Sequence, residues 1–136
     1  AVEGGTPTWQ DRMVQGVIKS ILEPIYEPIF QKTSHGFRPG CSQLTALRDI
    51  RKNFGDVIWI VQGDISKPFD MVDHSSLINL LRTRISDERL LLLIKAGIQA
   101  RILLPGGVLT TPHVQTSNAG VLSPLLSNIY LHQLDK

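Results

Sequence analysis

Apolar residues follow helical spacing from Trp9 to Ile29, at Met13, Val17, Ile18, Ile21, Leu22 and Ile25. This spacing predicts a helix, with Thr6 or Thr8 as the capping residue at its start. Proline cannot donate a backbone hydrogen bond within a helix, so we expect Pro24 and Pro28 to divide the run into a helix and a shorter successor.

The next segment combines an apolar side with a basic side. Residues 34–40 read as a loop, and Ser42 is expected to open a helix. One side of that helix carries Leu44, Ala46, Leu47 and Ile50, and another carries Arg48, Arg51 and Lys52. A solvated face is the usual explanation of such a basic cluster, and phosphate contact is the functional one.

One short apolar run has the character of a strand. After a turn at Gly55-Asp56, the residues from Val57 to Val61 are almost continuously apolar, which favours a buried central strand. Trp59 within this run, like Trp9, is expected in the core.

The remaining pattern predicts three helices and a hairpin, which together with the strand indicate an α+β or α/β fold. The helices cover 73–84, 88–100 and 122–134, and the hairpin pairs 101–104 with 108–114 around Pro105-Gly106-Gly107. We expect Ser86-Asp87 to cap the second of these helices, and Pro124 to be tolerated in the first turn of the third. Residues 1–136 form a single domain in this interpretation, since no linker or repeat is visible.

Composition limits the function classes without choosing one. The 136 residues are 42% hydrophobic and 19% charged, which is typical of one globular core. A net charge of +2 does not by itself indicate nucleic-acid binding. The single cysteine, Cys41, excludes an internal disulfide and a cysteine-rich zinc site. No apolar run approaches 18 residues and no leader is evident, so no membrane partner is expected.

Asp64 is the strongest candidate for chemistry. It follows the apolar run directly, with Phe69 five residues on and Asp70 behind it. A carboxylate at the end of a buried strand is suited to holding a divalent metal against a phosphate. Its ordinary structural explanations are a solvated acid at a strand end and a cap for the helix that follows.

Several ordered motifs accompany Asp64, and together the chain resembles the reverse transcriptase of group II intron maturases. The motifs are Pro7-Thr8-Trp9-Gln10-Asp11-Arg12, Leu22-Glu23-Pro24-Ile25-Tyr26-Glu27-Pro28, Gly36-Phe37-Arg38-Pro39, Gly63-Asp64-Ile65 with Phe69-Asp70 and Asp73-His74, and the block from Gly120 to Leu131 that contains Leu122-Ser123-Pro124-Leu125-Leu126. The palm pattern is similar to the mitochondrial-like class. The resemblance implies the fingers and N-terminal half of the palm of a right-hand polymerase, without thumb or maturase domain. The helices would then pack on a small, incomplete sheet.

The resemblance also assigns roles. Asp64 matches the palm aspartate, and Phe69 matches the aromatic residue that screens the 2′ position of the nucleotide. Asn118, Ala119 and Gly120 match the frame of the nucleotide pocket. Arg12 and Arg38 match cationic positions near the template or the nucleotide, so the expected RNA-binding residues are Arg12, Arg38, Arg48, Arg51 and Lys52. A core phenylalanine and surface arginines paired with nearby acids are the ordinary alternatives.

Departures from the family pattern weaken the expectation of catalysis. The sequence contains no Tyr-Ala-Asp-Asp, which in the family completes the metal site. Ser117-Asn118-Ala119 stands where Pro-Gln-Gly is usual, Cys41 stands where an arginine is usual, and Pro68 replaces an aromatic residue or cysteine. We therefore expect Asp64 to be vestigial and no cofactor to be bound, with Mg²⁺ held only if a second chain completes the site.

The function expected from these observations is a non-catalytic remnant of an organellar maturase reverse transcriptase. It would bind intron RNA or rRNA, together with a protein that covers the open palm edge, in a ribonucleoprotein such as a splicing complex or a mitochondrial ribosome. The resemblance is the ground for expecting a mitochondrial location. Two alternatives remain: one piece of a split or larger active RNA-directed DNA polymerase, and a purely structural protein-interaction module.

Overall fold

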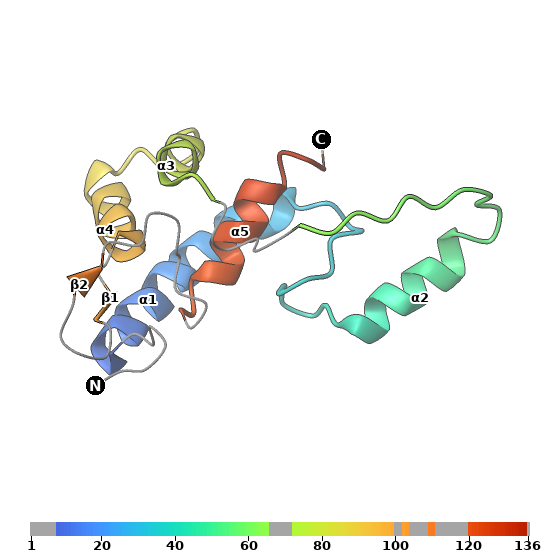
Figure 1. Ribbon diagram of the computed structural model, residues 1–136, viewed down its shortest axis with the longest axis horizontal. Helices are drawn as coiled ribbons and strands as arrows, with labels where there is room; N and C mark the ends of the chain where they lie inside the picture. Colours follow the sequence, from blue (N-terminus) through green and yellow to red (C-terminus); the bar gives the residue numbers. More distant parts are fainter. Residues whose placement is uncertain (1–7, 66–71, 100–101, 104–108, 111–119, 136) are drawn as a thin grey trace.

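Helices account for most of the secondary-structure elements among the described residues (Figure 1). The computed structural model describes residues 8–65, 72–99, 102–103, 109–110 and 120–135. In chain order the elements are α1 (Trp9–Tyr26), η1 (Glu27–Ile29), α2 (Gln43–Asn53), α3 (His74–Arg82), α4 (Glu88–Ile98), β1 (Ile102–Leu103), β2 (Leu109–Thr110) and α5 (Ser123–Leu131).

Four helices begin at a side chain that caps them. Thr8, Ser42, Asp73 and Asp87 each accept a hydrogen bond from a backbone N–H in the first turn of α1, α2, α3 and α4. Ser42 and Thr45 form a reciprocal capping box. The hydroxyl and backbone N–H of Ser76 donate to the Asp73 carboxylate and hold its pKa below the ordinary value. The predicted starts at Thr8, Ser42 and Asp87 are confirmed.

The first helix ends later in the chain than its prolines predicted. Pro24 lies inside α1 rather than ending it, and the helix continues to Tyr26 before tightening into η1, which contains Pro28. One lost backbone hydrogen bond is tolerated here because α1 buries Ile18, Leu22 and Tyr26 along one face.

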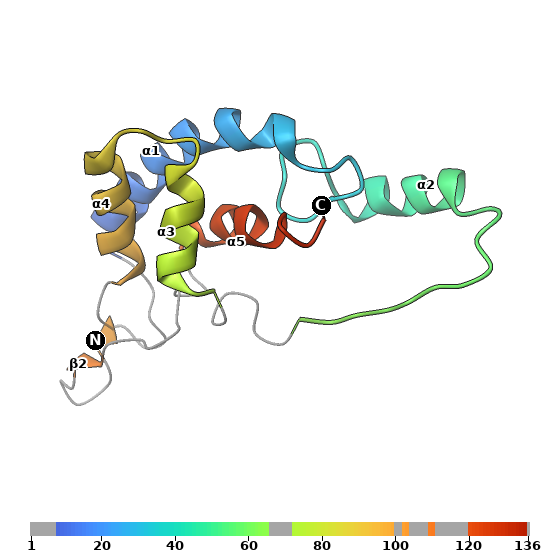
Figure 2. The same ribbon diagram turned by 90° about the horizontal axis from the view of Figure 1, so that it is seen from above.

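The hydrophobic core is formed by helices packed on helices. α5 lies against α1 and α3, and α3 packs on α4 (Figures 1 and 2). The largest fully buried side chains come from all four of these helices: Leu22, Leu77, Leu81, Leu91, Ile94 and Ile129. We call α1, η1, α3, α4 and α5 the body.

The expectation of helices packed on a small sheet is wrong. Residues 57–61 are in none of the strands among the described residues, and Trp59 is 86% exposed. Trp9 is likewise exposed. The only strand pairing in the described part of the chain joins β1 and β2, two residues each, with Ile102 opposite Thr110. A strand is stabilised by a neighbouring strand, and the body buries its apolar faces helix against helix instead.

Residues 31–65 lie outside the core. Residues 31–41, here the root loop, lead from η1 to α2; residues 42–65, here the arm, comprise α2 and an extended return that project away from the body (Figures 1 and 2). All residues from 31 to 65 are described, and none of them is buried. Within the described ranges, no helix has the length and apolarity needed to cross a membrane.

Candidate nucleic-acid interface

Arg38 is the centre of a hydrogen-bond network in the root loop. Its Nε and Nη2 donate to the Glu27 carboxylate, at 3.0 and 2.7 Å from Oε1, and its Nη1 donates to the backbone oxygens of Gln31 (2.6 Å) and Ser34 (2.7 Å). The guanidinium also lies 5.3 Å from the centre of the Phe30 ring. Only 10% of the Arg38 side chain is exposed. These contacts fasten the root loop to the end of α1 and to η1.

The network bears on the predicted role of Arg38 in RNA binding. Four of the five guanidinium N–H donors already have protein acceptors, so a phosphate would have to compete with Glu27 and with the backbone oxygens of Gln31 and Ser34 for them. A direct phosphate contact by Arg38 stays a prediction. What the geometry supports is that Arg38 orders the root loop.

A second tie joins the root loop to the body. Asn128 of α5 donates from Nδ2 to the backbone oxygen of Gly36 at 2.7 Å. On the other side of the loop, the His35 ring nitrogens lie 3.1 Å from Thr45 Oγ1 and 3.5 Å from Asp49 Oδ2 of α2. The root loop is thus hydrogen-bonded both to the body and to the arm.

The basic face of α2 is the most accessible of the predicted RNA-binding sets. Arg48, Arg51 and Lys52 are all exposed, and none of the three forms an ion pair with another described residue. Arg51 and Lys52 lie in the last turn, where the helix dipole favours cations, which is a structural reason for their presence. Their exposure on the projecting arm leaves them able to reach phosphates.

Arg12 is not part of this group. It is exposed in the first part of α1. The start of this helix lies at the end of the body away from α2 (Figures 1 and 2). The structure therefore brings Arg48, Arg51 and Lys52 together and leaves Arg12 apart.

The predicted nucleotide pocket is only partly within the described residues. Asp64 is exposed at the end of the arm, whereas Gly120 is buried beside α1. The predicted positions Phe69, Asn118 and Ala119 lie outside the described residues. Gly120 has a local reason to be glycine: an added Cβ would lie 2.9 Å from Gln15 Oε1, the atom that accepts the Val121 N–H at 3.0 Å.

The described residues do not fit a metal site. Nowhere among them do three or more His, Cys, Asp or Glu side chains gather as ligands. Mg²⁺ needs several oxygen ligands, of which protein sites usually supply more than one carboxylate.

Three residues that form the hydrogen bonds described above were not predicted from the sequence: Gln15, Glu27 and Asn128. Glu27 and Asn128 lie within the family-like motifs, so a polar side chain in an otherwise apolar motif was the available signal. No signal pointed to Gln15, because its partner is 106 positions away.

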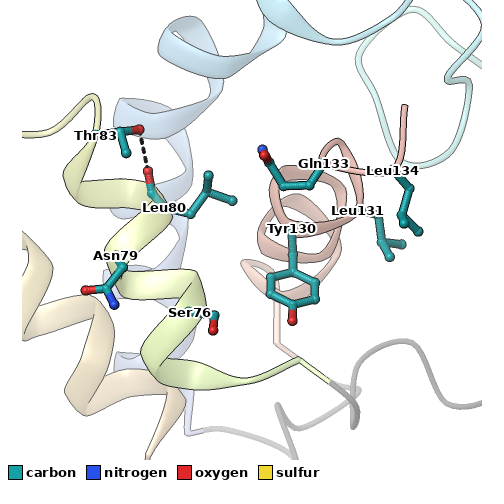
Figure 3. A pocket seen from close by; sticks show the side chains of 8 residues that line it. All are labelled: Ser76, Asn79, Leu80, Thr83, Tyr130, Leu131, Gln133 and Leu134. Carbon is teal, nitrogen blue, oxygen red and sulfur yellow. Dashed lines mark hydrogen bonds between the residues drawn. The ribbon is translucent and has the colours of Figure 1, made fainter. Parts of the chain in front are cut away.

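A separate cleft lies between α3 and the end of α5 (Figure 3). It measures about 620 Å³ and is lined by Ser76, Asn79, Leu80, Thr83, Tyr130, Leu131, Gln133 and Leu134. None of the predicted site residues lines it.

Comparison with known proteins identifies the class. The family model described as reverse transcriptase (RNA-dependent DNA polymerase) matches residues 4–136, so the chain belongs to the reverse transcriptase family. The resemblance to group II intron maturases seen in the motifs is confirmed by named relatives.

Three relatives illustrate the sequence identity and the share of each protein that the match covers. The group II intron-encoded protein LtrA of Lactococcus lactis subsp. cremoris is 46% identical over 97% of this chain and 22% of its own length. An uncharacterized 91 kDa protein in the cob intron of Schizosaccharomyces pombe is 43% identical over 97% of this chain and 16% of its own length. Nuclear intron maturase 1, mitochondrial, of Arabidopsis thaliana is 40% identical over 72% of this chain and 14% of its own length. The chain thus spans about a fifth or less of these relatives.

Proposed function

We propose that this chain is an RNA-binding segment of a group II intron-encoded reverse transcriptase or maturase, and that RNA lies along the arm. The exposed basic face of α2 carries the proposal. The 46% identity to a protein named as group II intron-encoded supports intron RNA as the ligand, and rRNA is the other candidate.

Phosphate contact accounts for this arrangement physically. Cations on a projecting helix neutralise phosphates and release counterions, so affinity falls with salt. The root loop, fastened by Arg38 and Asn128, fixes the position from which α2 projects. The arm buries no side chain of its own, which leaves its surface available for such contacts.

The test compares two matched double variants. Arg51→Gln with Lys52→Gln removes two charges from α2, and Arg89→Gln with Lys95→Gln removes two exposed charges from α4. Binding of single-stranded RNA is measured over a range of salt concentrations. The α2 pair should lower the log-log salt slope by about 1.4, or 0.7 per contact, and the α4 pair should leave it unchanged. Equal slopes for both pairs would reject the proposal.

We further propose that these 136 residues do not synthesise DNA by themselves. The support is the sequence: it offers Asp64 as palm aspartate but no Tyr-Ala-Asp-Asp, and Ser117-Asn118-Ala119 at the nucleotide frame. Primer extension above a no-protein control, with Mg²⁺ or Mn²⁺, would contradict this.

A second candidate is one piece of an active polymerase, favoured by the small share of each relative that the chain covers. The same primer-extension assay decides between the two when the remaining segments of LtrA are added as a separate polypeptide. Extension restored by that addition supports the second candidate. Extension absent with RNA binding intact supports a non-catalytic component.

We also propose a protein partner for the extended return of the arm. Ile58, Trp59, Ile60 and Val61 are all more than four-fifths exposed, and a contiguous apolar run of this kind is typical of an interaction surface. Covering it should shift the Trp59 fluorescence to the blue in the native assembly. Unchanged emission would argue against a partner at this segment.

We also propose that this protein is located in mitochondria. This location is supported by the relative named uncharacterized mitochondrial protein ymf11, from Marchantia polymorpha, and by the Arabidopsis maturase. Cell fractionation tests it, and recovery of the protein outside mitochondria would reject it.

A further inference from the structure

Phe37 in the root loop has an unusual backbone conformation. Its φ of 54° is the only positive φ of a non-glycine residue in the described part of the chain. A bulky residue in this left-handed region is disfavoured, and such conformations persist only where surrounding contacts impose them. The Phe37 side chain is 70% exposed, so burial of its ring does not compensate for the backbone.

Contacts on both sides of Phe37 impose its conformation. The backbone oxygen of Gly36 accepts from Asn128, and the side chain of Arg38 is held by Glu27, Gln31 and Ser34. The chain then turns back through a hydrogen bond from the Cys41 N–H to the Arg38 oxygen, at 3.2 Å. A hydrogen-bonded frame therefore directs an aromatic ring outward instead of into the core.

We propose that Phe37 is a stacking platform for a base of single-stranded RNA. Bases stack on exposed aromatic rings regardless of sequence, and a ring whose backbone is already fixed loses little freedom on binding. This inference rests on the proposed RNA-binding function and adds the residue that receives a base.

The surroundings of Phe37 favour a base over a protein. Its neighbours in the root loop are small or polar, including Gly36, Pro39, Gly40 and the exposed Lys32. Protein docking sites usually gather several large apolar side chains around an anchor, as residues 58–61 do on the arm. An exposed ring between Gly36 and Arg38 suits a flat base whose phosphates remain in solvent.

The experiment substitutes Phe37 in the purified native protein that contains residues 1–136. Phe37→Leu removes the aromatic face and keeps an apolar side chain, and Phe37→Tyr keeps the face. Affinity is measured for single-stranded RNA and for the same RNA with abasic positions, at several salt concentrations. Thermal melting shows whether each variant is folded.

Loss of stacking should weaken intact RNA binding by about 5- to 150-fold for Phe37→Leu and leave Phe37→Tyr near the unsubstituted protein. The salt slope should not change, because no phosphate contact is removed. Abasic RNA should bind the unsubstituted protein and Phe37→Leu equally.

Different results separate the RNA-binding function from the role of Phe37. If the unsubstituted protein binds no RNA, the proposed function and this inference both fail. If RNA binding is normal and Phe37→Leu leaves it unchanged, this inference alone is overturned. The inference is likewise overturned if Phe37→Leu instead weakens association with a protein of the native assembly.

If Phe37→Leu is unfolded, a photo-crosslink from 4-thiouridine RNA to the unsubstituted protein decides. A crosslinked peptide containing Phe37 supports the stacking platform, and its absence overturns the inference.

Discussion

The body and the arm both contain amphipathic helices, but these helices differ in how far their apolar residues are buried. α3 buries Leu77, Ile78 and Leu81, whereas α2, which has a comparable apolar stripe, buries none of its residues. The burial differs because α3 packs on α4 and α5, whereas α2 has no extensive packing against another helix in the described part of the chain. An amphipathic pattern therefore predicts that a helix forms, but its burial depends on what lies opposite.

The largest expected difference between the body and the arm is in the free energy of unfolding that is lost when a leucine is replaced by alanine. Leu81→Ala in α3 should lower the free energy of unfolding by about 2 to 5 kcal/mol, because it empties a fully buried position. Leu47→Ala in α2 should change it by about 0.5 kcal/mol or less, because Leu47 is exposed. Urea denaturation measures both. Similar losses for the two variants would show that the arm belongs to the core.

The tie between the two regions should have an intermediate effect. Arg38→Ala removes the hydrogen bonds that fasten the root loop and should cost about 1 to 2 kcal/mol; the partial exposure of Glu27 keeps the value in this range. Arg82→Ala breaks the exposed pair with Glu88 and serves as the control, with a smaller expected loss. The thermal midpoints of the two variants test the order, and a reversed order would contradict it.

A pH-dependent effect should appear at the start of α3. Bonding to Ser76 lowers the pKa of Asp73 below its ordinary value of 3.8 in the folded state. The carboxylate therefore stabilises the fold at pH values above 3.8, and this contribution is lost as the pH falls through the lowered pKa. Asp73→Asn should melt earlier than the unsubstituted protein at neutral pH, and the difference should shrink in acid. A difference that is constant with pH would exclude this role.

The smallest effect is expected at the cap of α2. Ser42→Ala removes the capping box and should destabilise α2 locally by about 1 kcal/mol. Because α2 lies outside the core, hydrogen exchange in residues 43–53 should accelerate while the midpoint of global unfolding stays unchanged. A matching fall in the global midpoint would mean that the arm and the body unfold together.

The sequence predicted local structure better than tertiary packing. Helix starts at Thr8, Ser42 and Asp87 follow from side chains adjacent in sequence, and the family resemblance followed from motifs. The supposed strand at 57–61 was wrong because apolar composition cannot reveal whether a pairing strand is present. The network around Arg38 was also out of reach, since it depends on Glu27 and two backbone oxygens brought together only by the turn after η1.

We propose above all that the root loop and α2 bind RNA while the body supports them. Hydrogen exchange of the purified protein, with and without single-stranded RNA, tests it most directly. We predict slower exchange in residues 31–53 on RNA addition and unchanged exchange in α3 and α4. Protection confined to α3 and α4, or no protection under conditions where RNA is bound, would contradict the account.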